Sequence, residues 1–130
     1  MSKRQREKAA VRREKKKAAN PTASLRLLRM PASKVRLVVD LVRGKGVEEA
    51  LNILNFTPKY AAKPLAKLLR SAVANAEQKG GYDVDSLVLL NAQVGEAPQM
   101  KRFRPRAMGR ANGIIRRTCH VTFQLGTAGK

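Results

Sequence analysis

The residues best suited to chemistry in this 130-residue chain are cationic side chains crowded into one stretch near its C-terminus. The stretch contains seven such side chains, of which six are arginines, and no acidic residue follows Glu96 in the sequence. They are Lys101, Arg102, Arg104, Arg106, Arg110, Arg116 and Arg117. The planar guanidinium of arginine can donate two parallel hydrogen bonds to one phosphate and can also pack on bases. This pattern predicts binding to a polyanion.

The residue types that support catalysis do not form a usable constellation. Cys119 and His120 are adjacent on a predicted strand, so their side chains point to opposite faces and cannot form a nucleophile–base pair. We expect Cys119 to be a small buried residue and His120 to face the polyanionic partner or solvent. Glu48 and Glu49 are expected to complement a helix N-terminus. With one cysteine and one histidine, the chain is predicted to bind no metal and no cofactor, and not to be an enzyme.

The whole chain is strongly basic, with 28 Lys and Arg against 9 Asp and Glu and a formal net charge of +19. So many like charges repel one another, and a polyanionic partner would neutralise them. Nucleic acid is the strongest candidate, because Lys and Arg that bind its phosphates release condensed counterions, which favours binding. Three Phe, two Tyr and no Trp are too few for base stacking to be the main binding mode. No stretch reaches the ~18 apolar residues of a membrane span, and the basic N-terminus lacks the apolar region of a secretory signal. A cytoplasmic location is therefore expected.

The first 20 residues differ from the rest of the chain, because they lack the apolar side chains that could form a buried core. Residues 1–20 hold nine Lys or Arg and are expected to be a basic extension, either a solvated tail or, as we favour, an arm that folds along RNA. Asn20-Pro21 marks the boundary. Residues 21–130 are expected to form one domain, which begins with a short strand over residues 24–30.

Three amphipathic helices are predicted from the spacing of apolar residues. The first lies between Ser33 and Gly44, and the second begins near Val47. The third runs from about Thr57 to Gly80. Pro64 removes a backbone donor in the second turn of this helix, so the helix either begins nearer Ala61 or kinks at the proline.

The cationic stretch lies between two predicted antiparallel strands. Residues 87–94 are rich in aliphatics, and residues 119–125 alternate between apolar and polar. Because the connection is too long for an ordinary loop, we interpret it as a β-ribbon arm over about residues 95–118 that turns near Pro105–Gly109. Gly113 in the returning strand is expected to mark a bend or a bulge.

The predicted dimensions of the ribbon make it an arm. Strands of roughly 18 residues would be about 60 Å long, whereas the core would be only about 30 to 35 Å across. The ribbon would therefore overhang the core by about 25 Å. An isolated ribbon is marginal in water, so we expect an anionic surface to order it. Charges that only protect an open edge are a weaker explanation, because one or two lysines suffice for that purpose.

Three segments of the chain resemble a known family. They are SKVRLVVDLVRGK at 33–45, AVANAE at 72–77, and KRFRPRAMGRAN at 101–112 followed by RRTCHVT at 116–122. In this order they are similar to the bacterial large-subunit ribosomal protein twenty-two family, from about Ser24 to Leu125. The resemblance implies an α+β fold in which three helices pack on a small three-stranded antiparallel sheet with a long protruding β-hairpin arm. It does not extend to residues 1–20.

The same resemblance implies a structural role in the large ribosomal subunit. Proteins of that family bind large-subunit ribosomal RNA, adjoin neighbouring large-subunit proteins and support subunit assembly. The hairpin tip lies in the wall of the nascent polypeptide exit tunnel, near the site of macrolide antibiotics, which it would influence indirectly. Residues implied at or near the tip are Met100, Lys101, Arg102, Arg106, Met108, Gly109 and Arg110. Residues expected to bind ribosomal RNA are Arg26, Arg29, Lys34, Arg36, Arg43, Lys45, Lys101, Arg102, Arg104, Arg106, Arg110, Arg116, Arg117 and His120.

Two other classes of protein share some of these features. A DNA-architectural protein also uses β-ribbon arms, but it needs an apolar wedge at the ribbon tip, where this chain has arginines around Pro105. A cationic membrane-active protein needs an apolar face beside its charges. The most highly charged segments here have no such face, so RNA remains the favoured partner.

Overall fold

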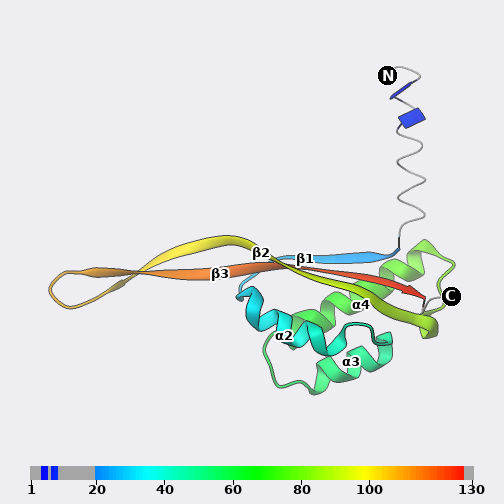
Figure 1. Ribbon diagram of the computed structural model, residues 1–130, viewed down its shortest axis with the longest axis horizontal. Helices are drawn as coiled ribbons and strands as arrows, with labels where there is room; N and C mark the ends of the chain where they lie inside the picture. Colours follow the sequence, from blue (N-terminus) through cyan, green and yellow to red (C-terminus); the bar gives the residue numbers. More distant parts are fainter. Residues whose placement is uncertain (1–3, 6, 9–19, 128–130) are drawn as a thin grey trace.

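The computed structural model describes residues 4–5, 7–8 and 20–127, so most of the predicted basic extension lies outside the described residues. Within residues 20–127 the elements follow in the order β1 (Thr22–Leu28), α2 (Ala32–Val42), α3 (Val47–Phe56), α4 (Ala62–Lys79), a short 3-10 turn η1 (Val84–Ser86), β2 (Leu87–Pro105) and β3 (Ala111–Thr127). The strands form one antiparallel sheet in the order β1-β3-β2. Figure 1 shows the helices gathered on one side of the sheet, which confirms the predicted α+β fold.

β3 is the central strand of the sheet, and its successive side chains alternate between the two faces of the sheet. Cys119, Val121, Phe123 and Leu125 are fully buried against the helices, whereas His120, Thr122 and Gln124 are half-buried on the open face. This confirms the predicted period of two. β1 begins two residues earlier than expected, because the Pro21 carbonyl accepts the Leu125 N–H at 2.9 Å and pairing starts at Thr22.

The helices pack their apolar stripes into a core that includes Val35, Val39, Leu65 and Leu69. α4 begins at Ala62, which decides between the two alternatives for Pro64. The proline lies in the first turn, where its missing N–H would have had no helical partner. At the other end, Gly80 has φ 69° and ends the helix as expected.

The predicted arm is present. β3 loses its β1 partner beyond Cys119, and from there to Ala111 it pairs only with β2 in the described chain. At about 3.3 Å per residue this two-stranded part is about 26 Å long. Figure 1 shows it extending beyond the helices on one side of the molecule.

The turn at the end of the arm also lies where it was predicted. The Arg106 N–H donates to the Arg110 carbonyl at 2.7 Å, and the chain reverses through Met108 (φ 58°) and Gly109 (φ 65°). The expectation of a bulge at Gly113 is wrong, because Gly113 pairs in register with Phe103. The irregularity of the arm lies elsewhere, between Ala97 and Met100 of β2.

Candidate nucleic-acid interface

The arm leaves the core at the bulge between Ala97 and Met100 of β2. Pro98 has no partner in the ladder register, and proline offers no N–H to a neighbouring strand. The Thr118 hydroxyl, on the facing strand β3, donates a hydrogen bond to the Pro98 carbonyl at 2.7 Å. Thr118 is only 3% exposed. Its side chain therefore satisfies a carbonyl that the bulge takes out of the ladder, and it fixes the direction in which the arm departs.

We expect Thr118→Val to loosen the root of the arm. The substitution keeps the shape of the side chain but leaves the Pro98 carbonyl without its donor, which costs about 1 to 3 kcal/mol. Chemical denaturation should show the lower stability, and hydrogen exchange should show faster exchange of the arm amides. Thr122→Val is the matched control, because Thr122 lies on the same strand and its hydroxyl makes no hydrogen bond within the described chain. Equal effects of the two substitutions would contradict this role of Thr118.

A cationic hollow lies where the arm joins the core, and we call it the arm-root hollow. It is lined by Arg29, Pro31, Lys34, Met100, Arg102, Ile115, Arg116, Arg117 and Thr118. Five of these residues were predicted to bind RNA, and they come from the segment before α2, from α2 itself and from both strands of the arm. Among the residues that the structure describes, no acidic side chain lines the hollow. Its positive charges are therefore left for an external anion.

The strand register divides the arm into two faces. Directly paired residues of antiparallel strands present their side chains on the same face. Met100 pairs with Arg116 and Arg104 pairs with Asn112, so these arginines share one face. Phe103, which is 78% exposed, lies opposite Gly113 on the other face. The arm therefore presents an arginine-bearing face and a face with an exposed ring.

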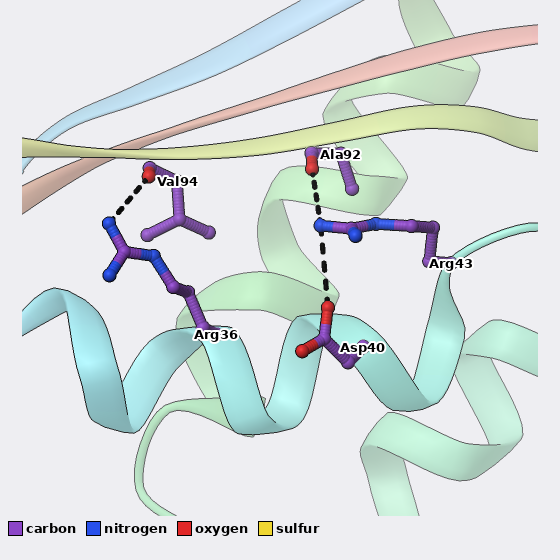
Figure 2. A network of polar contacts seen from close by, with 5 residues as sticks. All are labelled: Arg36, Asp40, Arg43, Ala92 and Val94. Carbon is purple, nitrogen blue, oxygen red and sulfur yellow. Dashed lines mark hydrogen bonds and ion pairs between the residues drawn. The ribbon is translucent and has the colours of Figure 1, made fainter.

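Two arginines predicted to bind RNA, Arg36 in α2 and Arg43 directly after it, turn back toward the protein (Figure 2). Arg36 Nη2 donates to the Val94 carbonyl at 3.4 Å, and Arg43 Nη2 donates to the Ala92 carbonyl at 3.0 Å. Arg43 Nη2 also lies 3.3 Å from Asp40 Oδ1. β2 is an edge strand of the described sheet, so these carbonyls have no neighbouring strand of that sheet on their side. The two side chains therefore link α2 and the residue after it to the sheet, and each uses only some of its N–H donors to do so.

Lys34 and Lys45, the other two residues in and next to α2 that were predicted to bind RNA, have different surroundings. Lys45 Nζ forms an ion pair with Glu49 Oε1 in the first turn of α3. Glu48 and Glu49 both occupy the first turn of α3, as predicted from the helix dipole. Lys34 instead lines the arm-root hollow. Of the four predicted residues from Lys34 to Lys45, the structure therefore brings only Lys34 to that hollow.

His120 has a structural contact that the sequence did not reveal. β1 contains a bulge between Leu25 and Leu28, where Leu27 has φ 55°. The Leu27 N–H leaves the ladder and donates to His120 Nδ1 at 3.0 Å. In a neutral ring the proton then resides on Nε2, which has no partner among the described residues. His120 lines a second hollow with Arg26 on the open face of the sheet.

Cys119 is a fully buried core residue, as predicted. Burial raises the pKa of its thiol, while the Arg36 guanidinium acts in the opposite direction. A buried thiol that stays protonated is a poor nucleophile. Within the described residues there is no group of three or more side chains able to hold a metal ion. The helices described are also too short or too polar to cross a membrane.

Comparison with known proteins identifies the family. The model of the family Ribosomal protein L22p/L17e matches residues 23–126. The large ribosomal subunit protein uL22 of Anaeromyxobacter sp. (strain Fw109-5) is 54% identical over 133 residues, covering 98% of this chain and 92% of the relative. The uL22 proteins of Geobacter sulfurreducens and Latilactobacillus sakei are 55% and 52% identical, covering 80% and 78% of this chain and 94% and 86% of each relative. These names denote ribosomal proteins and not enzymes. The chain belongs to the ribosomal protein L22p/L17e family.

Proposed function

We propose that this chain is a structural component of the large ribosomal subunit, located with the ribosome in the cytoplasm, and that it binds large-subunit ribosomal RNA. The observation that carries this proposal is the arm-root hollow. Five cationic side chains line it, and no acidic side chain of the described residues lies among them. Arg102 is the only one of the five with a hydrogen bond inside the described chain, to the Lys101 carbonyl and the Met100 sulfur. Such a site suits closely spaced phosphates of folded RNA.

The arm supports the same proposal. From residue 95 to residue 117 most side chains are exposed, and a two-stranded ribbon without a covering layer is marginal in water. Arg104, Arg106 and Arg110 near its end add like charges that nothing in the described chain neutralises. RNA packed around the arm would remove this repulsion. Bound RNA would therefore both cover the two-stranded ribbon and neutralise its charges, which nothing in the described part of the free protein does.

The proposal extends to the end of the arm. We infer that the turn lies in the wall of the nascent polypeptide exit tunnel, where it would meet the nascent chain and influence bound macrolides indirectly. Met108 at the turn is 92% exposed, and Arg106, Gly109 and Arg110 complete the turn. Met100, Lys101 and Arg102 lie further down β2 toward the arm-root hollow. Neighbouring large-subunit proteins would contact the globular part.

Directed hydroxyl-radical cleavage from the tip tests this placement. Met108→Cys provides an exposed thiol for an iron chelate, whereas the natural Cys119 is fully buried and its pKa is raised by burial. We expect the labelled chain to sediment with large subunits and to cleave ribosomal RNA in the tunnel wall. The wild-type chain taken through the same labelling is the control. A chain that never sediments with large subunits, or one that prefers duplex DNA, would refute the proposal.

A further inference from the structure

The end of α3 and the loop that joins it to α4 carry two exposed aromatic rings. Phe56 is 87% exposed and Tyr60 is 74% exposed. Leaving a phenylalanine side chain in water forgoes about 1.5 to 3 kcal/mol that its burial would contribute. Single exposed apolar residues are common on protein surfaces. Here, however, two of the five aromatic residues of the chain line one hollow.

This hollow, which we call the loop hollow, combines rings with positive charge. Its lining includes Asn55, Phe56, Pro58, Lys59, Tyr60 and Lys63, and within the described part of the chain it contains no acidic residue. Neither lysine forms an ion pair within the described chain. The hollow therefore offers flat apolar surfaces next to unneutralised cations. Figure 1 shows the connection between α3 and α4 on the helical side of the molecule, away from the end of the arm.

The loop is held in place by its own hydrogen bonds. The Thr57 N–H and the Thr57 hydroxyl both donate to the Ile53 carbonyl, at 3.0 and 2.6 Å. The Ala62 N–H donates to the Lys59 carbonyl at 3.0 Å. Pro58 adds a fixed φ between them. The backbone that carries both rings is therefore ordered before binding, which reduces the entropy lost when a partner binds.

We propose that the loop hollow binds an unpaired base of large-subunit ribosomal RNA, stacked on Phe56 or Tyr60, with the adjacent phosphates on Lys59 and Lys63. Aromatic rings beside cations are the usual means of holding a splayed-out nucleotide. The two lysines that line the hollow form no ion pair within residues 20–127, and their charge favours an anionic occupant over an apolar protein surface. The inference rests on the proposed RNA binding and adds to it a second contact of a different kind, on the globular part.

Binding of the full chain to a transcript of large-subunit ribosomal RNA tests this inference. The variant Phe56→Leu/Tyr60→Leu keeps apolar side chains but removes both rings. We expect its affinity to fall about 5- to 150-fold, the range for loss of one stacked base. The slope of log K against log salt should not change, because stacking releases no counterions. Lys59→Gln/Lys63→Gln should instead make that slope shallower, by about 0.7 per lysine.

Two further variants control for a general surface effect. Phe56→Trp keeps an aromatic face and should preserve wild-type affinity. Val84→Ala removes exposed apolar surface from η1, between Asp83 and Asp85, and should have no effect. The thermal midpoint of the ring variant should equal that of the wild type, because both rings are exposed. A lower midpoint would assign the rings to the fold and would overturn the inference.

The outcomes separate this inference from the proposed function. If the wild-type chain does not bind the transcript, the proposed RNA binding fails and the inference fails with it. If the wild type binds and the ring variant binds equally well, only the inference is overturned. If the ring variant binds the free transcript normally but is lost from assembled subunits, a protein occupies the loop hollow, and the inference is again overturned.

Discussion

Replacing Arg102, Arg116 and Arg117 by glutamine is expected to weaken binding of large-subunit ribosomal RNA by about 10²- to 10³-fold at 0.1 M salt. The three guanidinium groups line the arm-root hollow, and none forms an ion pair within the described chain. Removing each arginine–phosphate interaction should make the slope of log K against log salt shallower by about 0.7 to 0.9. Filter binding at several salt concentrations measures both quantities. The circular dichroism spectrum should stay unchanged, because the three arginines have no acidic partner among the described residues.

The matched control removes positive charge from another surface. Lys67 and Arg70 lie on the exposed face of α4 and line none of the hollows described above. Their replacement by glutamine should cost far less affinity per charge removed, because only the long-range field of the protein changes. Equal losses per charge in the two variants would mean that net charge, and not the arm-root hollow, accounts for binding. Unfolding of the triple variant would mean that the arginines serve the fold.

Phe123→Ala is expected to cost about 3 to 5 kcal/mol of stability. Phe123 is the largest of the fully buried side chains and lies on β3, the central strand. Such a loss is a large part of the roughly 5 to 15 kcal/mol that stabilises an ordinary domain. Because β3 also forms one strand of the arm, unfolding of the core should remove RNA binding as well. Denaturant titration, followed by circular dichroism, measures the change.

A phenylalanine on the arm is the control for this prediction. Phe103 is 78% exposed, so Phe103→Ala should change stability by less than about 0.5 kcal/mol. Adding excess ribosomal RNA should raise the unfolding midpoint of both variants, because a ligand that binds only the folded state stabilises it. If Phe103→Ala were as destabilising as Phe123→Ala, the arm would be part of the cooperative core and would not depend on RNA for its order.

Local patterns in the sequence predicted most of the elements. Apolar residues at helical spacing located α2, α3 and α4, and the alternation around Phe123 located β3. The turn at the arm tip followed from the residues around Pro105 and Gly109. These features are predictable because backbone dihedrals and side-chain periodicity depend on residues close in the sequence.

The positions of the bulges could not be predicted in this way. Gly113 is permissive toward many conformations, yet it lies in regular register. The bulge forms around Pro98 instead, where Thr118 supplies a hydrogen bond from the facing strand. Leu27 adopts φ 55° where His120 accepts its N–H. A bulge is stable where a distant partner satisfies the freed backbone group, and that partner is known only once the strands are paired.

The sequence by itself determined that this protein carries an arginine-rich arm for a polyanion, because charge and periodicity are properties of the residues themselves. Only the tertiary structure decided what each cation faces. Arg29 and Lys34 meet Arg116 in one hollow, whereas Arg36 and Arg43 bond to the edge of β2. The direction of a side chain depends on which elements pack beside it, and those contacts join residues far apart in the chain.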